Sequence, residues 1–278
     1  MNTKKTVALL TLVSILIACL LGCAETSDIG AEDKNIAIIT KGSDSDFWDD
    51  MKSGALAAAN EFNINVTVEG PESEEDYDTQ NGMIENAVSR KVDVIILSAI
   101  DYEKNAPSVQ NAIDSGIKVI TVDSDVNVKG KELFIGTDNI SAGEKAAKQA
   151  VELCKGQKSI NIGIVNYSEN TENGKQRLKG FTDYIGKIEN AKIVDTVNIE
   201  SNTQNATAGA KKLLEKHKEI NVLVGFNEWS TLGAGYAINE LNLKDKVFCI
   251  GFDSNISCID MLENGDIDIL IVQNPFSM

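Results

Sequence analysis

The sequence has a single histidine and far too few basic residues to balance its acids. Its 26 Lys and Arg residues against 42 Asp and Glu residues give a formal net charge of −16. Because basic patches recognise nucleic acids and anionic membrane surfaces, this charge argues against both as partners. The lone histidine, His217, lies in the charged run "LLEKHKEI" and is expected to be exposed to solvent. A zinc site or a histidine-activated serine or cysteine nucleophile is therefore not expected.

Other signatures of catalysis and cofactor binding are also missing. No G-x-S-x-G elbow occurs, and "CKGQKS" lacks the full spacing of a phosphate-binding loop, so it is interpreted as a helix end and a turn. The glycines of "LGAGYA" lie inside a helical pattern and indicate close packing. "DSDFWDD" and "ENGDID" resemble calcium loops in composition only. We predict no catalytic residue, no metal and no cofactor.

The five cysteines form no C-x-x-C pair. Cys19 and Cys23 belong to the N-terminal segment, whereas Cys154, Cys249 and Cys258 are widely spaced in the rest of the chain. Buried free thiols are predicted for these three, and a disulfide between Cys249 and Cys258 remains open.

The N-terminus has the pattern of a targeting segment. "MNTKK" supplies positive charge, and the apolar run after it ends in "LLGC" at Cys23, which resembles a bacterial lipobox. We predict a lipoprotein signal peptide over 1–22, lipidation of Cys23 and a polar linker over 23–33. The mature protein would be held on the outer face of the membrane, or in the periplasm, by lipid alone. A signal anchor, or a secretory peptide cut elsewhere, is the alternative.

From residue 34 onward, short apolar runs alternate with longer helical patterns. The runs are apolar on both faces, as in parallel strands that helices cover, and examples are "NIAIIT", "VDVIILS", "INIGIVN" and "KVFCIGFD". This alternation predicts α/β architecture with two doubly wound parallel-sheet (Rossmann-like) lobes and a hinge crossing near Gly136 to Asn139. A single (β/α)₈ barrel is the rival fold.

Polar side chains follow nearly every predicted strand. Because ligands bind beyond the carboxyl ends of strands in open parallel sheets, two facing lobes would form a cleft rich in carboxylates and amides. These groups accept and donate hydrogen bonds to sugar hydroxyls, and an aromatic ring can pack on the apolar face of a sugar. The stretch "KGSDSDFW" places two rings, Phe47 and Trp48, beside such a strand end. Carbohydrate binding therefore fits the pattern better than catalysis.

Several segments together resemble the type I periplasmic binding proteins of sugar ABC importers, the ribose-binding-protein family. They run in the family's order from residue 34 to the last residue, and are "IAIITKGSDSDFWDDMKSGA", "GIKVITVDSDV", "FIGTDNISAGEKAA", "NTENGKQRLKGF", "LVGFNEWSTLGA", "VFCIGFDSN" and "ILIVQNPFSM". The resemblance implies an N-terminal lobe over 34–137 and a C-terminal lobe over 138–273. It also implies the start of a return crossing over 274–278, without the segment that closes the family's fold.

Carried over residue by residue, the resemblance implies eight ligand contacts: Ser45, Phe47, Trp48, Asp123, Lys175, Asn227, Asp253 and Gln273. Purely structural roles remain open for most of them. The two rings could staple the start of a helix, Asp123 could cap a turn, and Lys175 could face solvent. Asn227 and Asp253 could be the N-caps of the helices that follow them.

The sequence also departs from the family pattern. Ser124 and Asp125 follow the first aspartate where the family often has arginine, and Lys175 stands at the usual arginine of the second lobe. The aromatic expected near Ser201 is missing, and Trp229 is a candidate replacement. "GPESEED" and "VDSDV" resemble relatives that bind rhamnose or autoinducer-2, so ribose itself is not expected.

The resemblance implies a monomeric binding protein that captures a sugar or sugar-like ligand by hinge closure and delivers it to an ABC permease. Two alternatives are a sugar or autoinducer-2 sensor that signals to a kinase or chemoreceptor, and a secreted carbohydrate-active enzyme. No nucleic-acid partner is expected.

Overall fold

The computed structural model describes residues 34–278, so the predicted signal peptide, Cys23 and the linker lie outside the described residues. The first sheet is parallel and has the strand order β2-β1-β3-β4-β5. Its strands are β1 (Asn35–Ile39), β2 (Asn65–Glu69), β3 (Val94–Leu97), β4 (Lys118–Val122) and β5 (Leu133–Ile135). We call the part of the chain built on this sheet the first lobe.

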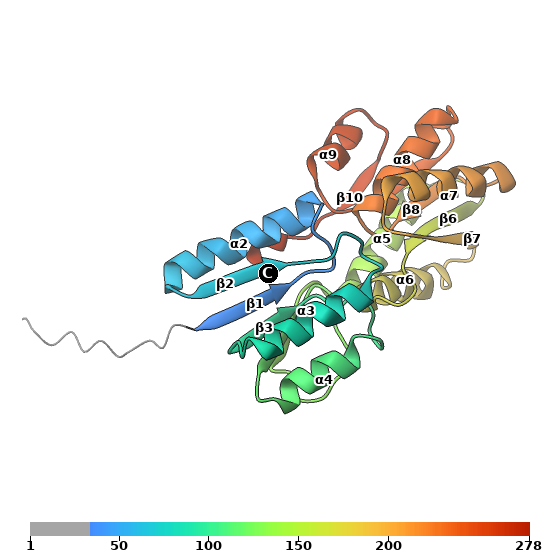
Figure 1. Ribbon diagram of the computed structural model, residues 1–278. Helices are drawn as coiled ribbons and strands as arrows, with labels where there is room; N and C mark the ends of the chain where they lie inside the picture. The colour runs from blue at the N-terminus through green and yellow to red at the C-terminus, as the bar shows by residue number, and fades with distance from the viewer. Residues whose placement is uncertain (1–33) are drawn as a thin grey trace, which may run out of the picture. The chain divides into compact units, whose positions relative to one another are not determined.

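Three helices cover the first sheet: α2 (Asp46–Phe62), α3 (Tyr77–Ser89) and α4 (Ala106–Asp114). Figure 1 shows α2 and α3 on opposite sides of the strands. The side chain of Ser45 caps α2, and that of Asp76 caps α3. Apolar side chains on the face of the sheet that packs against α3 and α4 are therefore removed from water, including Ile39, Ile95 and Leu97.

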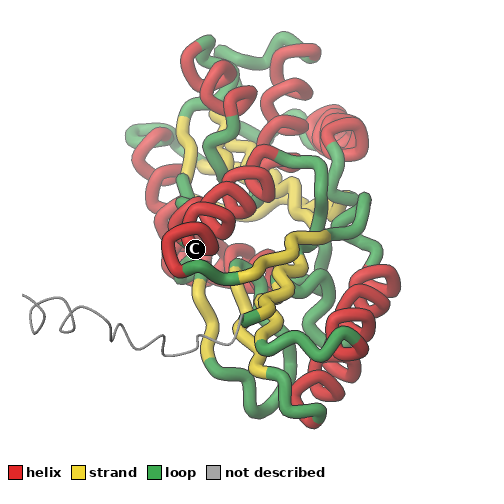
Figure 2. Tube along the Cα trace, turned by 60° about the vertical axis from the view of Figure 1, so that its left-hand side comes forward, coloured by secondary structure: helices red, strands yellow, loops and turns green. Residues whose placement is uncertain are grey.

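The second sheet repeats this topology with the strand order β10-β9-β8-β6-β7, again all parallel. Its strands are β6 (Ile160–Tyr167), β7 (Ala191–Ile199), β8 (Val222–Gly225), β9 (Phe248–Phe252) and β10 (Ile269–Ile271). The part of the chain built on this sheet is the second lobe. Figure 2 shows the strands of both sheets in yellow between the red helices.

The helices of the second lobe are α5 (Asn139–Leu153), α6 (Glu172–Ile185), α7 (Thr203–Lys216), α8 (Glu228–Glu240) and α9 (Ile256–Glu263). Glycines let several of them approach closely: a Cβ on Gly233 of α8 would overlap Ala206 of α7. The "LGAGYA" glycines thus serve close packing, as predicted.

The chain passes from the first sheet to the second between Ile135 and Ile160, an interval that contains the predicted hinge crossing. After β10 it turns back, and the short 3₁₀ helix η1 (Pro275–Ser277) packs against α2 of the first lobe. The C-terminus accordingly lies beside α2 in Figure 1. The carbonyl of Phe276 fits only because residue 54 of α2 is glycine.

The order of strands and helices confirms the predicted fold, and two open sheets exclude the single barrel. The predicted buried free thiols are confirmed for Cys154, Cys249 and Cys258. The prediction for His217 needs correction, because its ring is half-buried and its Nε2 lies 2.9 Å from Asp195 Oδ2. No helix between residues 34 and 278 has both the length and the apolar character needed to cross a bilayer.

Candidate ligand-binding site

A cavity of about 30 Å³ lies at the carboxyl ends of both sheets, lined by residues of both lobes. In each sheet the strand order reverses at one point, between β1 and β3 and between β6 and β8. Crevices at such switch points are where open α/β sheets bind ligands. The cavity walls carry Lys41, which follows β1, and Tyr167, which ends β6. The topology of each sheet therefore accounts for the position of the cavity.

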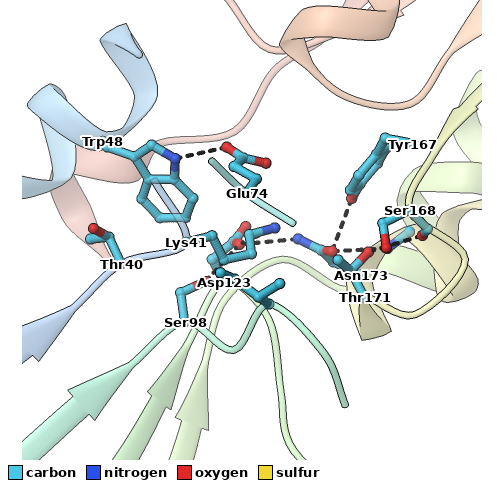
Figure 3. Close-up of polar contacts among 12 residues, drawn as sticks. Thr40, Lys41, Trp48, Glu74, Ser98, Asp123, Tyr167, Ser168, Thr171 and Asn173 are labelled. Carbon is cyan, nitrogen blue, oxygen red and sulfur yellow. Dashed lines mark hydrogen bonds and ion pairs between the residues drawn. The ribbon is translucent and has the colours of Figure 1, made fainter. Parts of the chain in front are cut away.

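Asp123 is the polar centre of the first-lobe side (Figure 3). It follows β4 with a φ of 58°, a left-handed conformation that Asp tolerates better than most residues. Its Oδ2 accepts hydrogen bonds from Ser98 Oγ and from Asn173 Nδ2 of the second lobe, both at 3.0 Å. The same oxygen lies 3.3 Å from Lys41 Nζ. Asp123 thus joins two lobes, a role larger than the capping of a local turn.

Lys41 is a buried cation that the sequence analysis did not select. Only 3% of it is exposed, and its Nζ lies 5.7 Å from the ring centroid of Trp48 and 5.6 Å from that of Tyr167. Burial by itself would lower the pKa of the amine, but the Asp123 carboxylate, with the Tyr167 phenol and Glu74, outweighs burial and raises it. Lys41 therefore carries its charge inside the cavity wall.

The aromatic pair has both a packing role and a position in the cavity wall. Ser45 Oγ accepts a hydrogen bond from Trp48 N at 3.4 Å, which caps α2. Trp48 is buried, Phe47 is half-buried, and their rings meet edge to face with centroids 4.9 Å apart. Trp48 Nε1 donates to Glu74 Oε1 at 2.8 Å. All three of Ser45, Phe47 and Trp48 line the cavity.

The second lobe supplies amides and a second aspartate. Asn227 caps α8 in a capping box with Ser230 and also lines the cavity. Asp253 does not cap the helix that follows it, because Asn255 caps α9. Its Oδ1 instead accepts from Gln273 Nε2 at 2.6 Å, and its Oδ2 accepts from Glu228 N at 2.9 Å. Asp253 therefore sits at the N-terminus of α8, where a negative charge is favoured.

Burial acts on the carboxylates of the cavity wall. Burial raises the pKa of Asp253, and the Arg177 guanidinium opposes that rise. The pKa of Glu74 is also raised by burial, against the attraction of Lys41 and the hydrogen bond from Trp48. Burial and the repulsion of Asp253 raise the pKa of Glu228 to about 8. Burial thus disfavours the anionic forms of all three carboxyls, even where Arg177 or Lys41 opposes it.

Lys175, which the resemblance predicted as a ligand contact, is not part of the cavity wall. The buried Arg177, two residues later, lines the cavity instead. Lys175 is exposed, and its Nζ lies 5.5 Å from the ring centroid of Tyr102. Arg177 is 1% exposed and lines the cavity. Two residues correspond to about 200° of rotation around a helix, so positions 175 and 177 face opposite sides. Asn173 and Arg177, spaced i and i+4, share the inward face.

Arg177 directs its guanidinium to protein atoms. Its Nε donates to Asn139 Oδ1, its Nη1 to the carbonyl of Phe226, and its Nη2 to Gln273 Oε1, at 2.7 to 2.8 Å. The same Gln273 oxygen accepts from Thr137 Oγ1 at 2.8 Å. Arg177 and Gln273 therefore tie the second lobe to the crossing segment around Thr137 and Asn139.

Seven of the eight predicted residues are brought together in one wall, and Trp229 lines it too. Sequence reasoning missed six cavity residues: Lys41, Glu74, Tyr167, Asn173, Arg177 and Glu228. The i, i+4 spacing of Asn173 and Arg177 could have found that pair, but the burial of Lys41 and the partial burial of Glu74 have no local signal. Within residues 34–278, no group of His, Cys, Asp or Glu has the arrangement of a metal site.

The sequence matches the periplasmic binding protein domain family over residues 36–278, and the chain belongs to this family. The fructose import binding protein FruE of Bifidobacterium longum is 26% identical over 99% of this chain and 85% of its own length. A carbohydrate transporter solute binding protein from Agrobacterium radiobacter, solved in complex with D-arabinose, superimposes with a TM-score of 0.85. It is 28% identical, over 89% of this chain and 85% of that one.

A third similar protein, XylFII, was solved in a complex with LytSN; it has a TM-score of 0.83 and 32% identity over 88% of this chain and 89% of its own. The fold, the cleft and these relatives define a type I periplasmic binding protein, the kind to which the sugar-binding proteins of ABC importers belong. It is a binding protein and not an enzyme.

Proposed function

We propose that this chain is a lipid-anchored extracytoplasmic protein that captures a sugar or sugar-like ligand between its lobes and delivers it to an ABC importer permease. The observation that carries the proposal is the set of polar groups and rings from both lobes around one cavity, centred on Asp123, Asp253 and Trp48. Carboxylates and amides suit sugar hydroxyls, and the rings suit the apolar face of a sugar. The ligand contacts that we propose are Ser45, Phe47, Trp48, Asp123, Asn227, Asp253 and Gln273, with Lys41 and Arg177 in place of Lys175.

Hinge closure is supported by the size of the cavity. A volume of about 30 Å³ has room for little more than one water molecule. A monosaccharide is several times larger, so its entry requires the lobes to separate and then to close around it. Closure would bring Asp123 and Asn173 against the ligand from opposite sides.

A ligand screen tests this function. The purified chain without its signal segment is screened by thermal shift against monosaccharides, including L-rhamnose, and against autoinducer-2. One compound is expected to raise the melting temperature strongly. The stabilisation should be lost in Asp123→Ala and in Asp253→Ala and retained in Lys175→Ala, because Lys175 lies outside the cavity. The function is wrong if no compound in the screen binds, and the assigned site is wrong if both aspartate variants bind normally.

The lipid anchor is tested separately. Cells that express the full chain are expected to incorporate labelled palmitate into the protein, and Cys23→Ser should abolish the label and release the protein from the membrane fraction. Labelling of the serine variant would contradict the assignment of Cys23.

A second candidate function is that of an extracytoplasmic sensor, and the observation behind it is that XylFII, a similar protein, was solved in complex with a second protein, LytSN. A binding protein whose closed form docks on a sensor would use the same cavity but a different partner. Cross-linking in the native cell with ligand present distinguishes the two functions. Capture of a permease supports delivery, and capture of a kinase or chemoreceptor supports sensing.

A further inference from the structure

Glu228, the first residue of α8, is buried next to the cavity, and one of its two carboxylate oxygens lacks a hydrogen-bond partner among residues 34–278. Only 6% of the residue is exposed, and its Oε2 has no hydrogen-bond partner within residues 34–278. The Asn255 side chain bonds the carboxylate from one side. The side chain lines the main cavity and also a smaller adjoining cavity of about 20 Å³. A buried carboxylate oxygen without a donor is costly, so it indicates a donor that arrives with the ligand.

The charges around the cavity do not balance. Four carboxylates line it, namely Glu74, Asp123, Glu228 and Asp253, against the two cations Lys41 and Arg177. Lys41 is paired with Asp123. The guanidinium of Arg177 donates to two amide oxygens of side chains and to one backbone carbonyl, all of them neutral. Two further carboxylates, Asp46 and Asp50, line the adjoining cavity.

This imbalance is concentrated at Glu228. Glu74 accepts from the Trp48 indole, and Asp253 accepts from an amide side chain and from a backbone N–H. Glu228 has only Asn255, and the charged groups closest to it are the carboxylates of Asp253, Glu74 and Asp46. A neutral hydroxyl could donate one hydrogen bond to Oε2, but it would leave the Glu228 carboxyl without a cation to stabilise its ionised form. An ammonium group supplies both a donor and the missing charge.

We propose that Glu228 selects a sugar-like ligand that carries a protonated amine, with the ammonium donating to Glu228 Oε2. This inference rests on the proposed function, because it assumes that the cavity takes a monosaccharide-sized ligand. The other carboxylates and amides of the cavity wall then bind the hydroxyls of the sugar, and the rings pack on its apolar face, as in the proposed function.

The protonation of Glu228 gives the inference a second, independent signature. Because its pKa stands at about 8, the carboxyl is largely protonated at pH 7 before the ligand enters. A neighbouring ammonium lowers that pKa, so the amine ligand displaces the proton into solvent. A neutral sugar displaces none.

The experiment compares matched ligand pairs by isothermal titration calorimetry at pH 7 on the purified chain. D-glucosamine is set against D-glucose, D-galactosamine against D-galactose and D-mannosamine against D-mannose, with the N-acetyl forms as uncharged controls of similar size. At least one amine is expected to bind about tenfold or more tightly than its parent sugar. Titration in buffers with different ionisation enthalpies should show release of close to one proton for that amine only.

The variant Glu228→Gln keeps the shape and removes the charge. It is expected to abolish the preference for the amine over its parent sugar and to abolish the proton release. The matched control is Glu240→Gln at the exposed end of the same helix, which should bind like the unmodified protein.

The outcomes separate this inference from the function on which it rests. If neutral sugars bind and no amine binds more tightly, or if Glu228→Gln keeps the preference, the role of Glu228 is refuted while the sugar-binding function stands. If no monosaccharide of either kind binds, both are refuted.

Discussion

At the scale of single residues, the cavity depends on a buried ion pair that fixes the position of its central carboxylate. Lys41 and Asp123 are each 3% exposed and 3.3 Å apart, and two rings flank the amine. Such a pair contributes little net stability when intact, but the loss of one partner leaves the other charge buried without compensation. The pair therefore constrains which substitutions the site tolerates.

Lys41→Met is expected to destabilise the protein by about 3–5 kcal/mol, because Asp123 would keep its burial and lose its cation. Lys175→Met, an exposed lysine exchanged in the same way, should change stability by less than about 0.5 kcal/mol. Urea unfolding followed by tryptophan fluorescence measures both. Equal effects of the two substitutions would show that Lys41 is not held as an ion pair.

The raised pKa of Glu228 predicts that the stability of the ligand-free protein depends on pH. Its pKa is raised from 4.5 to about 8 in the folded protein, so folding favours the protonated form. That contribution is fully present below the unfolded pKa and is lost as the pH rises towards 8. Between pH 5 and 8 the protein should therefore lose stability relative to Glu228→Gln, by at most about 1.4 kcal/mol per pH unit. Urea midpoints at several pH values test this, and parallel curves for the two proteins would contradict it.

At the scale of elements, the contact between α5 and α6 connects the fold to the site. Gly143 and Gly180 bring the two helices so close that a Cβ on either would overlap a carbonyl oxygen of the other helix, from Arg177 and from Ile140. Arg177 leaves α6 at this contact and bonds Asn139 at the start of α5. Close packing of the helices therefore sets the position of the guanidinium beside the cavity.

Gly180→Ala is expected to destabilise the protein by about 1–3 kcal/mol, since the added methyl must push α5 and α6 apart. The matched control is Gly82→Ala in α3, where nothing lies within 4 Å of the added Cβ. That substitution should stabilise the protein by about 0.5–1 kcal/mol, because alanine favours a helix more than glycine does. Unfolding in urea gives both values, and effects of the same sign would refute the packing argument.

At the scale of the whole described molecule, few contacts hold the two lobes together at the cavity. Besides the bond between Asp123 and Asn173, Glu75 Oε1 accepts from the backbone N–H of Ser201 at 2.6 Å. On the other flank Tyr102 N donates to the carbonyl of Asn170 at 3.1 Å. Such bonds are made only in the closed arrangement, so they should control how long a ligand stays.

Glu75→Ala is expected to speed ligand dissociation about fivefold and to leave the association rate nearly unchanged, because one interlobe hydrogen bond is lost after closure. Glu72→Ala, at an exposed position of the same loop, is the control. Stopped-flow fluorescence can follow both steps, since the two tryptophans of the chain, Trp48 and Trp229, line the cavity. An unchanged dissociation rate would show that the Glu75 contact plays no part in closure.

The sequence by itself determined the order of strands and helices, the two-sheet fold and the positions of Asp123, Asn227, Asp253 and Gln273. These follow from local patterns, because apolar runs set the strands and the carboxyl ends of parallel strands meet at one edge of a sheet. The sequence also indicated both roles of Asn227, as the N-cap of a helix and as a residue of the cavity wall.

Only the tertiary structure decided which charges are buried. Lys41 and Glu74 belong to polar stretches that resemble exposed loops, and Glu228 resembles an ordinary acidic residue in a first helical turn. The burial of Lys41 and Glu228, and the partial burial of Glu74, depend on elements distant in sequence that close over them. The exchange of Lys175 for Arg177 has the same origin: a helix presents one face to its neighbours, and the packing of α5 against α6 selects that face. Whether a charged side chain is buried in the cleft depends on the residues that surround it in the fold, so the sequence pattern around that residue does not determine it.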